Sequence, residues 1–202
     1  MNNPHRLNDA YAAHFKSWFT NNHTISKQAY FVTITFEHEA RRRQRRQAEG
    51  LSQGSFEWDA FNHLYNLTCR SLIGRNYHRS CNRSLLPHVA AFLDAEGTRH
   101  WRCAGDLTNL HFHSIWLIDE SNVSQFEEAM NVNGSMGDAW RSLSFDEIDV
   151  KPIDTSINDD VERAISYASK LMGFNNEHLS VGTDFEVYPK PNTDHGAGTS
   201  SF

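Results

Sequence analysis

The most constraining feature of this sequence is residues 110–118, a run rich in aromatic and β-branched side chains that is typical of a β-strand. Side chains alternate between the two faces of a strand, so His111 and His113 must point to one side and Phe112 to the other. Two imidazoles on one face can bind a divalent metal ion, although two histidines on a half-solvated sheet are the commoner explanation. The segment predicts a strand and a metal site that needs support from elsewhere.

That support comes from residues 158–172, whose apolar side chains recur at helical spacing. Tyr167 falls at the edge of the apolar stripe, with Arg163 four residues before it and Lys170 three residues after it on the same flank. Nearby positive charges favour the phenolate form and so activate a tyrosine as a nucleophile. The competing interpretation is an amphipathic tyrosine at the edge of the core, beside an ordinary surface lysine.

The two segments complement each other chemically. Tyrosine is an uncommon nucleophile, and its best-known use is attack on a DNA phosphodiester, which conserves the bond energy in a phosphotyrosine. That attack requires the charge of the phosphate to be neutralised, and a metal ion held by His111 and His113 would do so. The pair is therefore a stronger indication of function than either segment alone.

The other predicted elements give an α+β order. Residues 56–73 have helical spacing and end at Gly74, and residues 85–94 predict a strand that pairs with residues 110–118 as a long antiparallel hairpin. The remaining predictions are strands at 29–36, 148–153 and 185–188, and helices at 123–130, 137–143 and 158–172. The order β-α-β-β-α-β-α predicts a central antiparallel sheet of about five strands with helices packed on it.

Two strands carry further information about their place in the sheet. Residues 29–36 do not alternate cleanly between polar and apolar, which predicts a central strand covered on both faces, whereas Pro152 indicates an edge strand or a strand end. We expect three parts: an N-terminal arm or helix at 1–28, one folded domain at 29–174 and a partly flexible C-terminal extension at 175–202.

Charge and composition restrict the class of protein. The net charge of −6 argues against a generic polyanion binder, but the basic residues are clustered and the acidic ones concentrate after Asp119. One basic block is residues 41–46; the second comprises Arg70, Arg75, His78, Arg79 and Arg83. A nucleic acid could follow such a basic side, although a solvated helix face is the better interpretation of any single arginine. The sequence has no membrane-length apolar run and no signal-like N-terminus. Its three cysteines, an odd and sparse count, fit a reducing compartment. We therefore expect a cytoplasmic protein with no membrane partner.

Three segments carry a family resemblance: residues 31–36, His111-Phe112-His113 and Tyr167-Ala168-Ser169-Lys170. In this order they resemble the first-strand, His-hydrophobic-His and Tyr-x-x-Lys motifs of the HUH endonucleases. The nearest type is the single-tyrosine replication initiator (Rep) proteins of rolling-circle plasmids and phages. The motifs span about residues 29–173. The resemblance implies that residues 29–174 form an HUH endonuclease domain, with a ferredoxin-like sheet and a tyrosine helix that faces the histidines.

The resemblance also implies an activity and a cofactor. A protein of this family would use Mg²⁺ or Mn²⁺ to nick single-stranded DNA at an origin, leaving a 5′-phosphotyrosine and a free 3′-OH that starts rolling-circle replication. Tyr167 would attack, and Lys170 would orient or charge-stabilise the reacting groups. In Rep-type relatives a third metal ligand comes from the strand before the histidines; Glu96 is the first candidate and Asp94 the second. In related transposases that ligand follows the tyrosine by one turn, where this chain has Leu171.

DNA contacts and partners complete the expectation. The basic and aromatic candidates for DNA contacts are Arg41, Arg42, Arg43, Arg45, Arg99, Trp101, Arg102 and Arg163, with Trp101 able to stack on a base. The expected substrate is single-stranded or hairpin DNA at an origin. The chain is too short for an attached helicase, so a host helicase and polymerase are expected partners of a monomer or weak dimer. The alternatives are a single-tyrosine transposase, a non-catalytic DNA-binding protein on the same fold, and a metal-dependent phosphodiesterase that uses water.

Overall fold

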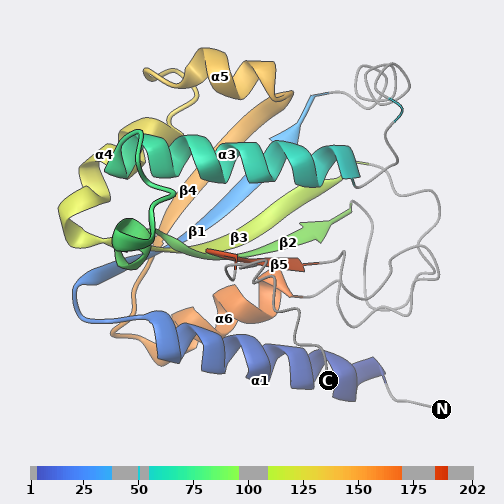
Figure 1. The fold of residues 1–202 in the computed structure, drawn as a ribbon. Helices are drawn as coiled ribbons and strands as arrows, with labels where there is room; N and C mark the ends of the chain where they lie inside the picture. The colour runs from blue at the N-terminus through green and yellow to red at the C-terminus, as the bar shows by residue number, and fades with distance from the viewer. Residues whose placement is uncertain (1–3, 38–49, 51–54, 96–108, 170–184, 191–202) are drawn as a thin grey trace, which may run out of the picture.

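A five-stranded antiparallel sheet organises the protein in the computed structural model, which describes residues 4–37, 50, 55–95, 109–169 and 185–190 (Figure 1). The strands are β1 (Lys27–Phe36), β2 (His88–Asp94), β3 (His111–Asp119), β4 (Phe145–Ile153) and β5 (Phe185–Tyr188). Their order across the sheet is β4-β1-β3-β2-β5. β1 and β2 each pair antiparallel with β3 between them, which is the split β-α-β arrangement of ferredoxin-like topologies.

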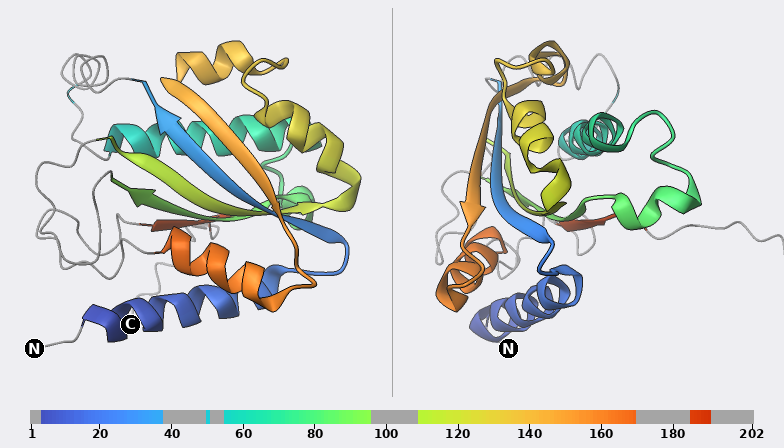
Figure 2. Two further views of the ribbon diagram at one scale, coloured as in Figure 1. Left: turned by 180° about the vertical axis from the view of Figure 1, so that it is seen from behind. Right: turned by 90° about the vertical axis from the view of Figure 1, so that its left-hand side faces the viewer.

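Helices cover both faces of this sheet, as Figures 1 and 2 show. On the upper face of Figure 1 lie α3 (Ser55–Ile73), α4 (Val123–Met130) and α5 (Gly137–Ser142). On the lower face lie α1 (Pro4–Asn22) and α6 (Asn158–Ala168). Two short 3-10 turns, η1 (Ser80–Leu85) and η2 (Glu120–Asn122), precede β2 and α4. The predicted α+β class, with helices packed on an antiparallel sheet of five strands, is confirmed.

Each face of the sheet has its own apolar core. The upper core is mostly aromatic, and its fully buried side chains include Phe61, Phe112, Trp116, Phe126 and Trp140. The lower core joins α1 and α6 to the sheet through Phe15, Phe92, Ile115, Val161 and Ile165. β1 therefore lies inside the sheet with a core on either side, as the unbroken pattern of residues 29–36 predicts, and β4 with Pro152 is an edge strand.

Several element ends differ from the sequence prediction for local reasons. β2 begins at His88 and not at Leu85, because residues 80–85 form the 3-10 turn η1. The sequence offers Ser156 or Asn158 as the cap of the helix at 158–172, but the residue before α6 is Ile157. The backbone N–H and hydroxyl of Ser156 both donate to the Asp154 carboxylate instead, at 2.9 and 2.6 Å. α3 ends as expected at Gly74, whose φ of +100° suits glycine and whose N–H donates to the Arg70 carbonyl at 2.9 Å.

The terminal elements both belong to this architecture. Phe15 and Phe19 of α1 are buried in the lower core, and β5 extends the sheet by pairing with β2. Within the described part of the chain, no helix combines the length and the apolar character that a bilayer crossing requires.

Candidate metal centre and nucleophile

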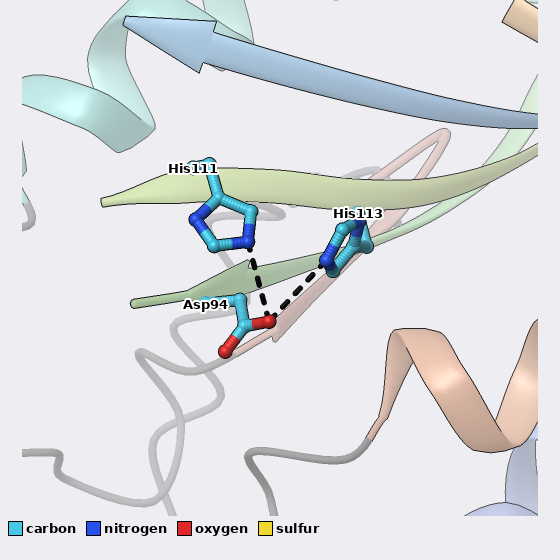
Figure 3. A group of neighbouring side chains, drawn as sticks. All are labelled: Asp94, His111 and His113. Carbon is cyan, nitrogen blue, oxygen red and sulfur yellow. Dashed lines mark ion pairs between the residues drawn. The ribbon is translucent and has the colours of Figure 1, made fainter. Parts of the chain in front are cut away.

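The pairing of β2 with β3 assembles a cluster of three ligand-type side chains at one end of these strands. In the register of the pair, Asp94 lies opposite His111, and Phe92 lies opposite His113. Because side chains alternate along each strand, Asp94, His111 and His113 all project from the lower face of the sheet. Figure 3 shows the two imidazoles and the carboxylate turned toward one another.

The three side chains converge closely. One carboxylate oxygen of Asp94, Oδ2, lies 3.3 Å from Nε2 of His111 and 3.3 Å from Nε2 of His113. The three ligand atoms all lie within 4.8 Å of one another. Asp94 is fully buried and His113 is 3% exposed, whereas the His111 side chain is 19% exposed at the mouth of the cluster. Two nitrogen ligands and one oxygen ligand are therefore held within the reach of a single metal ion.

Neighbouring groups orient all three ligands. Nδ1 of His111 donates to the Asn109 carbonyl at 3.0 Å, so this bond occupies Nδ1 and leaves Nε2 as the ring nitrogen that faces the cluster. Asn109 has a φ of +50°, a left-handed conformation that asparagine tolerates well. Nδ1 of His113 lies 3.3 Å from the Thr33 hydroxyl, and Oδ1 of Asp94 accepts the Ala95 N–H at 2.9 Å. These contacts fit a metal site, in which a second hydrogen bond fixes each ligand.

Tyr167 stands directly beside this cluster near the C-terminal end of α6. Its ring centroid lies 4.9 Å from that of His113 in an edge-on arrangement and 6.0 Å from that of Phe31. Val161, Ile165 and Ala168 anchor α6 in the lower core, which leaves Tyr167 at the border with 52% of its surface exposed. The structure thus joins a buried metal-type cluster to a solvent-accessible phenol.

The structure brings only some of the predicted site residues together. Of the two third-ligand candidates, Asp94 completes the cluster, and Glu96 lies outside the described residues. Arg163 forms an ion pair with Asp160 and donates through Nε to the Asp159 carbonyl at 3.2 Å, so its guanidinium is held at the first turn of α6. The other site candidates outside the described residues are Lys170, Arg41, Arg42, Arg43, Arg45, Arg99, Trp101 and Arg102.

Sequence reasoning missed the contribution of β4. Lys151 pairs with Phe31 across the β1–β4 ladder, and Phe31 contacts Tyr167, so Lys151 flanks the tyrosine. The Lys151 ammonium lies 2.7 Å from the Asp149 carboxylate, and the hydrogen bond to Asp149, together with the charges of Asp149 and Glu147, raises the pKa of the lysine. Alternation along residues 148–153 places Asp149 and Lys151 on one face, but only the register with β1 brings that face to the tyrosine.

Comparisons of this chain with protein-family models, with curated proteins and with solved structures found no match. The functional interpretation therefore depends on the chemistry of the cluster. A buried Asp-His-His group of this geometry could hold a metal ion. Tyr167, which borders the group and is half-exposed, could meet a substrate from solvent.

Proposed function

We propose that this protein is a metal-dependent endonuclease and strand transferase that acts on single-stranded DNA through a covalent phosphotyrosine. The observation that carries the proposal is the contact between the Tyr167 ring and His113, which belongs to the Asp94-His111-His113 cluster. A candidate nucleophile and a candidate metal site thus meet, although they come from α6 and from the β2–β3 pair. Structural tyrosines border many cores, but few border a buried group of metal ligands.

In the proposed reaction, the Oη atom of Tyr167 forms a bond to the scissile phosphorus. The bond from phosphorus to the 3′ oxygen of the preceding nucleotide breaks, the phenol loses its proton and the leaving oxygen gains one. The products are a 5′-phosphotyrosine and a free 3′-OH. Attack by a 3′-OH on the phosphotyrosine reverses these bond changes and joins strands, because the energy of the phosphodiester is kept in the covalent intermediate.

The chain's own residues prepare this reaction in distinct ways. Asp94, His111 and His113 would hold the cation, and the single buried carboxylate would leave part of the cation's charge available to a phosphate. When bound, a divalent cation would act as a Lewis acid on the scissile phosphate. Of the two expected ions, the two imidazole nitrogens favour Mn²⁺, because Mg²⁺ prefers oxygen ligands. The edge contacts of Tyr167 with His113 and Phe31 limit the orientations of the phenol.

At the biological level, we propose initiation of rolling-circle replication of a plasmid or phage from an origin read as single-stranded or hairpin DNA. A host helicase would unwind and a host polymerase would extend the 3′-OH, with the protein as a monomer or weak dimer in the host cytoplasm. The alternative is a single-tyrosine transposase. The position of Asp94 on the strand before the histidines favours the replication type, because the carboxylate does not come from the tyrosine helix.

The test combines the protein with labelled single-stranded and hairpin DNAs and Mn²⁺, followed by a denaturing gel. We expect a protein–DNA adduct that disappears with a chelator and in Tyr167→Phe. The matched control is Tyr77→Phe, which removes a hydroxyl from a half-buried tyrosine in the segment after α3 and should leave the adduct intact. Cleavage without an adduct would make water the nucleophile, and binding without cleavage would indicate a non-catalytic protein; either result would overturn the proposal.

A further inference from the structure

A cleft of about 620 Å³ lies at the end of β2 that is remote from the metal cluster. The C-terminal end of α1, η1 and β5 meet there. His88, the first residue of β2, lines this cleft, whereas Asp94, the last, belongs to the metal cluster. At the rise of an antiparallel strand, the two ends of β2 are about 20 Å apart. The cleft is therefore a separate place on the molecule, and it includes Arg83 of the second basic block.

The lining of this cleft is rich in hydrogen-bond donors. No aspartate or glutamate belongs to the lining, as far as the described residues show. The guanidinium of Arg83 is anchored at one corner, because Nη2 donates to the Lys190 carbonyl at 3.0 Å. The polar residues that line the cleft are Asn22, Ser80, Arg83, Ser84 and His88, together with Tyr188, whose hydroxyl is already bonded to Asn62 and Glu186. Such a set suits an anion with several acceptor oxygens.

The charged groups beneath the cleft also favour an anion. The Lys27 ammonium donates to Nδ1 of His88 at 2.7 Å and to the Asn22 carbonyl at 3.1 Å. A histidine that accepts at Nδ1 is neutral and keeps a donor at Nε2. Burial, together with the charges of Lys27 and Arg83, lowers the pKa of His88 to about 4. Two carboxylates oppose this charge: Asp119, the half-buried β3 partner of Lys27, and Glu186, which accepts from the Tyr188 hydroxyl and forms an ion pair with Lys190. The cleft is therefore electropositive.

The cleft also offers flat apolar surface beside these donors. Trp18 of α1 is half-buried, packs on the lower core and lines the cleft opposite Val187 and Pro189. An indole is the best stacking partner that a protein provides for a nucleobase, and base–aromatic stacking is largely independent of sequence. A phosphate alone would use the donors but not this surface.

We propose that this cleft binds one nucleotide, with its phosphate at Arg83, Ser80 and Ser84 and its base against Trp18. The shared chemistry is a nucleoside phosphate, from either a free nucleotide or one residue of a DNA strand. A nucleotide that belongs to a DNA strand rests on the proposed function. If the scissile phosphate of that strand lies at Tyr167, the nucleotide in the cleft would be about six positions away along the strand, at the rise of stacked DNA. The cleft would then help to select and orient the strand.

The test uses the full chain in EDTA and measures binding of 2′-deoxyadenosine 5′-monophosphate, of deoxyadenosine and of inorganic phosphate by calorimetry. We expect the nucleotide to bind at least about 10-fold more tightly than either fragment. Arg83→Gln should weaken nucleotide binding about 10-fold or more, and Trp18→Leu several-fold. Arg83→Lys, which retains the charge but loses the fork of donors, should fall between the wild type and Arg83→Gln.

The matched control is Arg79→Gln, which makes the same charge change at the residue before η1, outside the lining of the cleft. This variant should bind the nucleotide within about 2-fold of wild type. An equal loss in both glutamine variants would show generic charge attraction and overturn the proposal, as would inorganic phosphate that binds as tightly as the nucleotide. Thermal unfolding checks that Arg83→Gln still folds.

A second arm distinguishes the two sources of the nucleotide. Fluorescence anisotropy compares a 12-nucleotide and a 2-nucleotide single strand in EDTA. If Arg83→Gln weakens the 12-nucleotide strand as well as the mononucleotide, the cleft belongs to the DNA path; if it weakens the mononucleotide alone, the ligand is a free nucleotide. The Tyr167 adduct is measured separately. Loss of that reaction with intact nucleotide binding would contradict the proposed function and leave the nucleotide site standing.

Discussion

Two histidine sites stand at opposite ends of the β2–β3 pair, one with two histidines and one with His88 alone, and they differ in the charge beside them. At one end, His111 and His113 both face the fully buried carboxylate of Asp94. At the other end, His88 accepts a hydrogen bond from the ammonium of Lys27. All of these histidines lie on the lower face of the same sheet, within two paired strands.

The difference shows that the partner, and not the imidazole, decides which ligand a histidine cluster suits. A neutral imidazole has one lone pair and one N–H, so it serves cations and anions equally well. A buried carboxylate adds negative charge and oxygen ligands, which suits a metal ion. A half-buried ammonium, such as that of Lys27, adds positive charge and donors, which suits a phosphate. The four predictions below test this comparison, in order of decreasing effect.

The largest effect is expected from Asp94→Asn, which keeps the size of the side chain but removes the charge shared by both histidines. Affinity for Mn²⁺ should fall at least about 100-fold, because a direct ligand is worth more than the outer partners of metal ligands. Calorimetry in Mn²⁺ measures this change. Asp119→Asn, at the half-buried far end of β3, is the control and should bind Mn²⁺ as wild type does. Similar affinities in the two variants would show that Asp94 is not a ligand.

Metal binding should also stabilise the fold, because the cluster exists only in the native state. At a free Mn²⁺ concentration about 100 times Kd, the native state gains about 2.7 kcal/mol. For a chain of this size, that gain raises Tm by roughly 5–10 °C. Calorimetric scans with EDTA, Mg²⁺ and Mn²⁺ should show the largest rise with Mn²⁺. If Mn²⁺ raised the Tm of His113→Ala by the same amount, the ion would bind somewhere other than this cluster.

A smaller effect is expected at the Lys27–His88 end. The pKa of His88 is lowered to about 4 in the folded chain from an ordinary value of 6.5, so the unfolded chain binds the proton more readily. Stability from this group is present above about pH 6.5 and is lost as the pH falls toward 4. The loss should be about 1 kcal/mol, reduced by solvent screening at a half-buried ring. Urea unfolding at pH 7 and pH 4.5 measures it.

Two variants sharpen that result. His88→Gln should remove this part of the pH dependence, and Lys27→Met should raise the pKa of His88 because a neighbouring positive charge is lost. NMR titration of the imidazole follows the second change. An unaltered pKa in Lys27→Met would mean that the ammonium does not determine the electrostatics of this end.

The smallest effect is expected from Lys151→Gln on β4. Its charge lies beside Tyr167 but is exposed to solvent and paired with Asp149, so screening limits its influence. The rate of adduct formation should fall only about 2- to 5-fold in single-turnover kinetics. Lys16→Gln, an exposed paired lysine of α1, is the control and should leave the rate unchanged. A loss of 100-fold or more would place Lys151 among the reacting groups.

Much of this fold and part of this site follow from periodicity in the sequence. The alternation around His111 and His113 places both on one strand face, and the apolar stripe of residues 158–172 places Tyr167 at the edge of a core. Such patterns report which way a side chain points within its own element. They predict the class of fold and the orientation of two site segments.

Contacts between elements depend on register, which no local pattern contains. The sequence offered both Asp94 and Glu96 as third ligands, and only the pairing of β2 with β3 sets Asp94 opposite His111. The approach of Lys27 to His88 depends likewise on the turn between α1 and β1. Alternation cannot predict such pairs, because shifting a strand by one residue exchanges its faces.

The most direct test of the central claim follows the oxygen atoms of the cleaved phosphate. The protein is incubated with single-stranded DNA and Mn²⁺ in ¹⁸O-labelled water, and the products are mapped by mass spectrometry. If Tyr167 attacks beside the Asp94-His111-His113 cluster, the DNA fragment will be attached to Tyr167 and its phosphate will carry no ¹⁸O. A released fragment whose 5′-phosphate carries ¹⁸O, with no fragment on the protein at any time, would contradict the account.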